Sequence, residues 1–199
     1  MHMIKRILDI TLSSLLLILS APLFLVVSAA IKLTDGGPVL FKQTRIGKGG
    51  RPFVLYKFRS MVINADRMKN SLEEHNHHGN CVTFKMKRDP RVTLVGSIIR
   101  KLSMDELPQL WNVLRGEMSL VGPRPPLPDE VARYAPTELK RLEVPPGLTC
   151  LWQISGRADI PFEKQVELDR EYIENQNVLL DLKILIKTIP AVISCKGAY

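Results

Sequence analysis

The most apolar stretch of the chain lies near its N-terminus. Residues Ile10–Ile31 carry no charged side chain and are rich in Leu, Ile, Val and Ala. As a helix, these 22 residues would extend about 33 Å, enough to cross the hydrocarbon core of a bilayer. A signal peptide usually has a shorter apolar region and a small-residue cleavage site. The pattern therefore predicts a retained membrane helix.

Two features argue against a simple membrane span. Pro22 lies near the middle of the segment, where it removes a backbone hydrogen bond and kinks a helix, and Ser20 can bond to a carbonyl freed nearby. Lys5 and Arg6 precede the segment and Lys32 follows it, so the positive-inside rule favours the cytoplasm for both flanks. A re-entrant helix that breaks at Ser20 and Pro22 satisfies both flanks. A kinked span and a buried core helix remain alternatives.

The remainder of the chain shows short strand patterns and then helical patterns. Val39–Gln43 and Phe53–Met61 predict two strands joined by a Gly-rich turn, which is a small β-hairpin. The expected helices lie at Ala65–Glu74, Leu107–Leu114, Thr137–Leu142, Phe162–Glu174 and Val178–Ile193. Gly116 is expected to end the second helix, and prolines between 123 and 128 predict a stiff loop after it.

These elements predict an α+β protein that is mainly helical. We expect residues 1–35 to form a re-entrant helix-break-helix and residues 36–199 to form a compact cytosolic domain at the membrane surface. The apolar stripe of Val178–Ile193 either packs in the core of that domain or lies on the bilayer as an amphipathic interfacial helix.

Positive charge is concentrated around the apolar segment. The formal net charge is +8, and residues 1–60 hold nine Lys or Arg against two Asp or Glu, whereas the remainder is almost balanced. Basic charge beside an apolar segment indicates an anionic membrane surface. Nucleic acid is the competing explanation, but the basic residues form no recognition helix or stacking motif, so we expect no nucleic-acid partner. Three scattered cysteines predict no disulfide framework.

Several common chemistries lack their motifs. The sequence contains no P-loop, no His-Glu-x-x-His, no nucleophile elbow and no dinucleotide fingerprint. His75, His77 and His78 lack Cys or acidic partners at metal-ligand spacing, so we interpret them as part of a solvated loop rather than a metal site.

Asp105 and Glu106 form the first candidate site, at or just before the start of the helix that Pro108 begins. The positive end of a helix dipole favours ionised carboxylates and attracts anionic ligands. An ionised Asp can act as a nucleophile toward phosphorus or ligate Mg²⁺. Ser103 and Glu106 also match a capping box, which would make the acidic residues an ordinary helix start.

Arg124 is the second candidate, because Pro123 and Pro125 on either side restrict its backbone. A guanidinium presented in this way can bind phosphate oxygens in a bidentate pair. An arginine in an exposed proline-rich turn is the alternative interpretation. Lys57 and Arg59 alternate with aromatic residues on a predicted strand and would share one face, which is either solvated or directed at a phosphate.

These residues resemble a known family. The continuous run from Ser103 to Pro125 is similar to the signature of the bacterial sugar transferases called monotopic phosphoglycosyl transferases. The likeness continues, in the family's order and over almost the whole chain, through Tyr56–Met61, Asp89–Arg91, Gly147–Arg157 and Leu180–Lys183. Pro145 departs from the family, which often has a basic residue at this position.

The resemblance implies a reaction and its residues. Asp105 would be the nucleophile, and Glu106 would be its partner in a catalytic dyad that also holds Mg²⁺. Asp105 would attack the β-phosphate of a UDP-sugar, release UMP and hold the sugar phosphate covalently until polyprenol (undecaprenyl) phosphate takes it. The expected phosphate- and substrate-binding residues are Lys57, Arg100, Arg124 and Asp181.

The resemblance also implies a location and partners. The re-entrant helix, broken at Ser20 and Pro22, would enter only the cytoplasmic leaflet of the bacterial inner membrane. The reaction would be the first membrane step of surface polysaccharide or glycoconjugate assembly, and a homodimer is a further expectation. The chain would be a minimal member or a catalytic fragment. A catalytically silent protein that binds polyprenol phosphate or acts as a scaffold is the alternative, and an ordinary single-span anchor that carries an unrelated domain is another.

Overall fold

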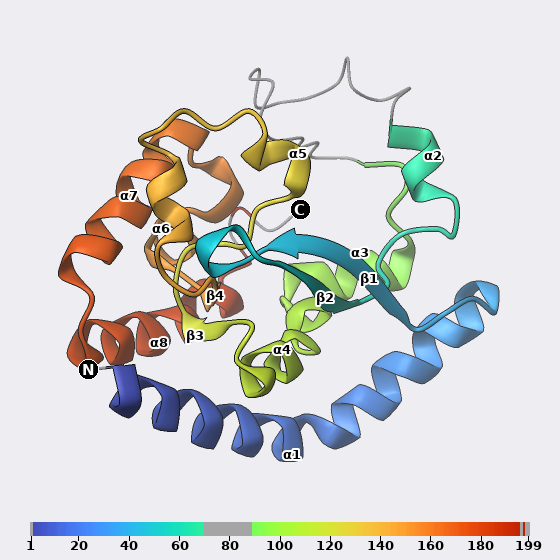
Figure 1. Ribbon diagram of the computed structural model, residues 1–199. Coiled ribbons are helices and arrows are strands. Elements are labelled where there is room, and N and C mark those ends of the chain that lie inside the picture. The colour runs from blue at the N-terminus through green and yellow to red at the C-terminus, as the bar shows by residue number, and fades with distance from the viewer. Residues whose placement is uncertain (1, 70–88, 196, 198–199) are drawn as a thin grey trace.

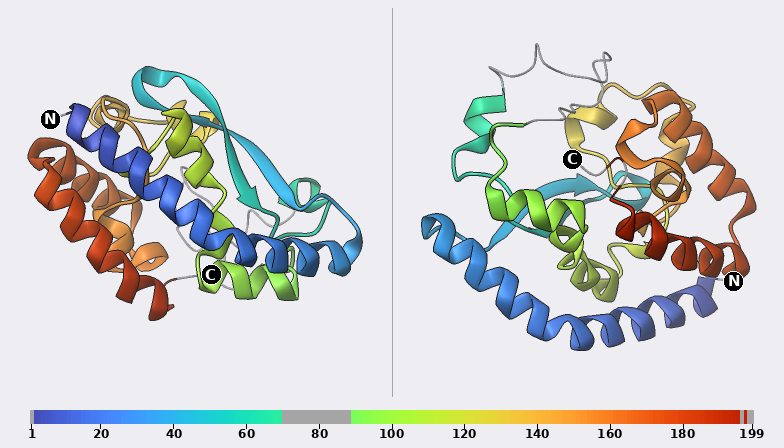
Figure 2. Two further views of the ribbon diagram at one scale, coloured as in Figure 1. Left: turned by 90° about the horizontal axis from the view of Figure 1, so that it is seen from below. Right: turned by 180° about the vertical axis from the view of Figure 1, so that it is seen from behind.

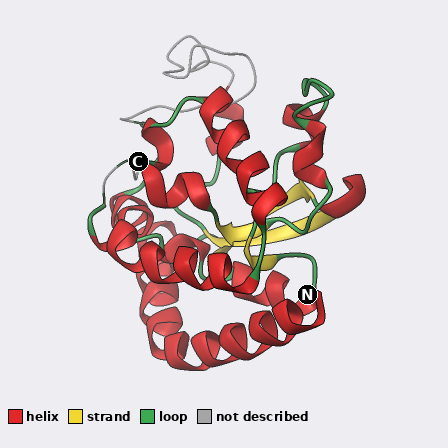
Figure 3. Cartoon of the chain, turned by 90° about the vertical axis from the view of Figure 1, so that its left-hand side faces the viewer, coloured by secondary structure: helices red, strands yellow, loops and turns green. Residues whose placement is uncertain are grey.

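The structure is a computed structural model that describes residues 2–69, 89–195 and 197. It is mainly helical, and the strands lie at the centre with helices around them (Figures 1 and 3). The α+β class is therefore confirmed. Short 3-10 helices are marked η. In chain order the elements are α1 (His2–Asp35), β1 (Leu40–Ile46), η1 (Lys48–Gly50), β2 (Pro52–Phe58), α2 (Ala65–Lys69), α3 (Leu94–Lys101), η3 (Met104–Glu106), α4 (Gln109–Arg115), β3 (Ser119–Val121), α5 (Pro128–Val131), η4 (Leu139–Leu142), β4 (Gly147–Thr149), α6 (Leu151–Ser155), η5 (Arg157–Asp159), α7 (Phe162–Asn175) and α8 (Val178–Ile193).

The helix α1 is longer than the apolar segment and is not interrupted at Pro22. Figure 1 shows that its two halves are inclined to each other, so the expected break is instead a bend within one helix. A proline removes only one backbone hydrogen bond, and the Ser20 hydroxyl donates to the carbonyl of Leu16 at 2.6 Å, within the turn before the proline. By length and composition α1 is long and apolar enough to cross a membrane, and only 11% of its most apolar window is buried.

Both ends of α1 are tied to the remainder of the described chain. Near its start, Lys5 forms an ion pair with Asp181 at 2.6 Å, and both terminal nitrogens of Arg6 donate to carbonyls in the last turn of α4. At its end, Asp35 pairs with Arg59. Figure 2 shows the result, in which α1 runs along the body of the protein with its first half beside α8. The helix therefore lies against the domain rather than projecting away from it.

The protein has two small sheets, of which the sequence predicted only the first. The strands β1 and β2 form the predicted antiparallel hairpin, with boundaries shifted by a few residues. The strands β3 and β4 form a parallel pair that was not predicted, in which Ser119 lies opposite Gly147 and Val121 opposite Thr149. The backbones of Gly147 and Gly122 lie very close together beside this pair. A Cβ added to Gly147 would lie 2.0 Å from the backbone nitrogen of Gly122.

The longer helices confirm the periodic pattern. The helix α4 ends at Gly116, whose φ of 80° is left-handed, and α7 and α8 lie where they were expected. Most of the α8 stripe lies outside the core, since Ile186, Ile189 and Ile193 are exposed and only Leu185 packs against the core cluster. The segment Thr137–Leu142 forms only the short η4, and α3, α5 and α6 were not predicted. The second half of the expected helix at 65–74 and the three clustered histidines lie outside the described residues.

The contact between Gly147, the first residue of β4, and Gly122, directly after β3, generates a prediction. Replacing Gly147 with alanine places a Cβ against backbone atoms that cannot rotate away, so we expect Gly147→Ala to lower the free energy of unfolding by about 2 kcal/mol or more. Gly47→Ala is the matched control, since its Cβ would meet nothing closer than 3.3 Å. Urea denaturation of both variants measures the difference, and equal losses would contradict the proposed close packing.

Candidate active site

The two candidate carboxylates lie in η3, directly before α4. Asp105 is buried, with 7% of its surface exposed, whereas Glu106 is partly buried. Ser103 precedes them with a left-handed φ of 53°, and its side chain caps no backbone group of η3. The capping-box interpretation is therefore wrong for Ser103 and Glu106. The side-chain oxygens of Asp105 and Glu106 are therefore not explained as part of a helix cap.

Lys57 is the nearest cationic partner of the dyad. It extends from β2, and its Nζ lies 2.6 Å from Oε1 of Glu106. Arg59, expected on the same face, instead turns to Asp35 at the end of α1. Lys57 therefore points to the carboxylate dyad, whereas Arg59 binds the end of α1.

Burial and charge act differently on the two carboxylates. Burial raises the pKa of Asp105 to about 6, the positive charge of Lys57 opposes this rise, and the negative charge of Glu106 adds to it. Burial also acts to raise the pKa of Glu106, but the attraction of Lys57, Arg124 and Arg157 outweighs it and lowers that pKa. The ion pairs of the described residues include one to Glu106 and none to Asp105. Asp105 is the less stabilised anion and the more available carboxylate.

Arg100 approaches the dyad from the last turn of α3. Its Nε donates to the Ser60 hydroxyl at 2.8 Å, which holds the guanidinium beside Asp105. Burial lowers the pKa of Arg100, while the negative charge of Asp105 favours its charged form. The helix α3 can pack this close because Gly96 faces the backbone of Ser60, where a Cβ would lie 1.9 Å from the carbonyl oxygen.

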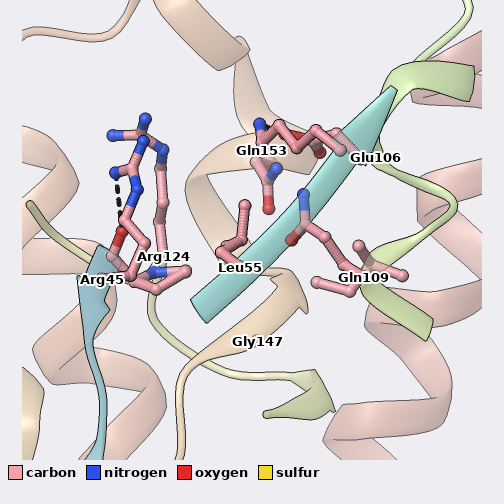
Figure 4. Close-up of a pocket in the computed structure, with 10 residues that line it drawn as sticks. Arg45, Leu55, Glu106, Gln109, Arg124, Gly147 and Gln153 are labelled. Atoms are coloured by element: carbon pink, nitrogen blue, oxygen red, sulfur yellow. Dashed lines mark hydrogen bonds and ion pairs between the residues drawn. The ribbon is translucent and has the colours of Figure 1, made fainter. Parts of the chain in front are cut away.

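Arg124 and Arg45 form a second basic group at the site. Arg124 follows β3 in the proline-rich loop, is partly exposed, and lies 4.0 Å from Oε1 of Glu130. Arg45, on β1, was not predicted as a site residue; it is buried and donates to the carbonyl of Pro125 at 3.0 Å. Figure 4 shows the two guanidinium groups side by side and directed the same way. Burial, together with the charge of Arg124, lowers the pKa of Arg45 to about 9.

A depression with about 270 Å³ of open space lies beside Glu106, Lys57, Arg45 and Arg124, whereas Asp105 is not among its lining residues. Its lining comes from β1, β2, η3, α4, the loop after β3, β4 and α6, so segments distant in the sequence build one site (Figure 4). The lining residues are Arg45, Leu55, Lys57, Glu106, Gln109, Arg124, Pro125, Gly147, Leu148 and Gln153. Two carboxylates surrounded by cations suit a reaction between anionic groups.

Two of the predicted substrate-binding residues, Arg100 and Asp181, do not line this depression. Arg100 acts on Asp105 from α3, whereas Asp181 has other partners. It lies at the start of α8, where it pairs with Lys5 and accepts a hydrogen bond from the Tyr172 hydroxyl at 2.8 Å. Lys5 also donates to the carbonyl of Val121. Asp181 therefore ties α1 to α7, α8 and β3, and its sequence motif carried no sign of that partner.

The donor set of the site suits one class of metal. In the described part of the chain, no group of three or more His, Cys, Asp or Glu side chains is placed to hold an ion. Asp105 and Glu106 supply carboxylate oxygens alone, and Mg²⁺ typically binds one or two carboxylates together with water and substrate phosphates. The residues therefore fit Mg²⁺ bound jointly with a phosphate rather than a protein-only cage.

Comparisons with known proteins agree with this site. The family model described as bacterial sugar transferase matches residues 1–195. The "Exopolysaccharide production protein ExoY" of Sinorhizobium fredii is 46% identical over 98% of this chain and 88% of that protein. The "Undecaprenyl-phosphate galactose phosphotransferase" of Salmonella typhimurium is 43% identical over 98% of this chain and 42% of its own length. The "UDP-glucose:undecaprenyl-phosphate glucose-1-phosphate transferase" of Caulobacter vibrioides is 41% identical over 98% of this chain and 72% of that protein. A match of this length, with a carboxylate dyad in a basic depression, means that the chain belongs to the bacterial sugar transferase family and is an enzyme that transfers a sugar phosphate.

Proposed function

We propose that this enzyme moves a sugar 1-phosphate from a UDP-sugar to undecaprenyl phosphate through a covalent intermediate on Asp105. The observation that carries the proposal is a buried carboxylate that has no ion pair with any described residue, beside a second carboxylate that Lys57 neutralises. The relatives named for galactose and for glucose are about equally similar to the chain. The proposal therefore names UDP-sugars as a class.

In the first step, an Asp105 carboxylate oxygen forms a bond to the β-phosphorus of the donor. The bond from that phosphorus to the bridging oxygen breaks, and UMP leaves with the electron pair. Both reactants are anionic, so the step needs neutralising charge, which Lys57, Arg100 and Arg124 are positioned to supply. Burial supports the role of Asp105, because a poorly solvated carboxylate keeps less of the hydration that weakens a nucleophile.

In the second step, a phosphate oxygen of the lipid acceptor forms a bond to the same phosphorus. The bond to Asp105 breaks, the carboxylate is restored, and the product is a polyprenol diphosphate sugar. One site thereby serves two anionic substrates in turn. Asp105 and Glu106 would hold Mg²⁺, which would neutralise phosphate charge when bound.

We further propose that α1 enters the cytoplasmic leaflet and returns to the same face of the inner membrane. Support comes from its ends, since Lys5 near the start and Asp35 at the end both pair with residues of one domain. A helix that crossed the bilayer would separate these ends by the membrane thickness. The exposed apolar faces of α1 and α8 would lie in the lipid, and the opening of the site would face the membrane surface.

The alternative is a catalytically silent protein that binds polyprenol phosphate. The basic depression alone would suit that role. The buried carboxylate does not, because an anion-binding site without chemistry gains nothing from a second negative charge beside a bound phosphate.

Loss of the nucleophile is the direct test of the reaction. We expect Asp105→Asn to reduce UMP release from UDP-sugars by about 10³-fold or more, because the amide cannot form the intermediate. Asp129→Asn, at an exposed position in α5, is the matched control and is expected to retain activity. Intact-mass measurement after quenching with donor alone should show a sugar phosphate on the wild-type chain and none on the Asp105 variant. Turnover by Asp105→Asn at the wild-type rate would refute the assignment.

The raised pKa of Asp105 predicts a cost in stability. The unfolded chain ionises this carboxyl near pH 4 and the folded chain near pH 6, so stability from this group is present at low pH and lost as pH rises through about 6. We expect Asp105→Asn to be more stable than the wild type at pH 7.5 without Mg²⁺, by at most about 3 kcal/mol. The difference should shrink toward pH 4.5 in denaturation measured with a chelator. A variant that is less stable at pH 7.5 would contradict this trade-off.

Cysteine labelling tests the proposed topology. We expect Met3→Cys, at an exposed position near the start of α1, to resist a membrane-impermeant maleimide in intact spheroplasts and to react after permeabilisation. The native cysteines would first be replaced by alanine. Glu167→Cys, exposed on α7, is the cytoplasmic control. Labelling of Met3→Cys in intact spheroplasts would exclude the re-entrant arrangement.

A further inference from the structure

The depression beside Glu106 has two sides of different chemistry. Figure 4 shows the guanidinium groups of Arg45 and Arg124 on one side of Leu55. The carboxamides of Gln109 and Gln153 lie on the other side. Guanidinium groups suit the oxygens of a phosphate, whereas a carboxamide is neutral and both donates and accepts hydrogen bonds. A ligand that fills the depression therefore needs an anionic part and an uncharged polar part.

Gln109 lines the depression without a polar partner. Only 3% of its surface is exposed, and the hydrogen bonds printed by the geometry of the described residues include none to its carboxamide. A polar group that is buried and unpaired costs free energy, so such groups in native proteins usually await a partner. Because Gln109 is part of the lining, that partner can reach it from the depression.

Gln153 presents a second carboxamide, from the short helix α6. Its Oε1 accepts a hydrogen bond from the Cys150 thiol at 3.2 Å, which orients the amide group. A thiol is a weak donor, and no described residue accepts a hydrogen bond from Nε2 of Gln153. The amide hydrogens of Gln153 are therefore available to a ligand beside Gln109.

The position of these amides relative to Glu106 indicates which part of the donor they meet. Gln109 follows Glu106 by three positions, about one helical turn, and both side chains line the depression. In a UDP-sugar, the sugar is joined directly to the β-phosphate, whereas the α-phosphate and the ribose separate that phosphate from uracil. Amides within one turn of the dyad are therefore nearer to the sugar than to the base. Sugar hydroxyls both donate and accept, as a carboxamide requires.

We propose that Gln109 and Gln153 bind hydroxyl groups of the sugar, in the UDP-sugar and in the phosphosugar intermediate, while Arg45 and Arg124 face the diphosphate. The inference rests on the proposed function and names the residues that recognise the sugar. A sugar without the matching hydroxyl leaves a buried amide unpaired, which costs free energy. The two glutamines thereby make the site selective among UDP-sugars.

Turnover of a UDP-sugar, compared with binding of UDP, tests the inference. Gln109→Met and Gln153→Met keep the length of the side chain and remove its amide. We expect each to lower kcat/KM for UMP release from UDP-glucose or UDP-galactose by about 10- to 100-fold. The inhibition constant of UDP, which has no sugar, should stay unchanged. Gln176→Met, at the end of α7 and outside the lining, is the matched control and should retain the wild-type kcat/KM.

Circular dichroism shows whether each variant is folded. If Gln109→Met does not fold, Gln153→Met carries the test, because its side chain is only partly buried. Unchanged kcat/KM in both variants, or folded variants that lose affinity for UDP as strongly as turnover, would overturn the inference. Turnover that depends on both glutamines, in a wild-type protein that carries no sugar phosphate after quenching, would refute the covalent mechanism and leave the sugar site standing.

Discussion

The site depends on the balance between two adjacent carboxylates and the cations around them. Asp105 is buried and its pKa is raised, whereas Glu106 is held ionised by Lys57 and by the more distant arginines. If either side of this balance were removed, the carboxylates would share a proton or the cations would repel one another in a poorly solvated depression. The fold around the site is largely a means of bringing cations from four separate segments to one acidic turn.

The polar residues of α1 attach this helix to the rest of the domain, which its apolar composition did not predict. Lys5 and Arg6 are the basic flank from which the orientation in the membrane was argued, yet both bind protein groups rather than solvent or lipid. Asp9 is buried in the same helix and accepts hydrogen bonds from the backbone and side chain of β3. The N-terminal segment is thus part of the architecture of the domain, and its exposed apolar surface is the side that the domain leaves uncovered.

The sequence predicted what short-range patterns encode. The hairpin, α4, α7 and α8 follow from alternation, helical spacing and Gly116, because each pattern lies within one continuous segment. Local patterns raised Asp105, Glu106, Lys57 and Arg124 as candidates, and the likeness to the family suggested their roles. The parallel pairing of β3 with β4 did not, because three-residue strands have no period and their partner is distant in the sequence. The contacts of Asp181 and Arg45 could not be predicted either, since both depend on which distant segments meet.

The short helix α4 connects the N-terminal helix α1 to the turn that bears the carboxylate dyad. Its last turn is held by Arg6 from α1, and its first residue, Gln109, lies three positions after Glu106 of the dyad. Seven helical residues span about 10 Å, so this element forms a short rigid connection between α1 and the turn that bears Asp105. A shift of α1 in response to bilayer thickness would carry the carboxylate with it, so that under the proposed reaction a lipid headgroup always meets the nucleophile at the same depth.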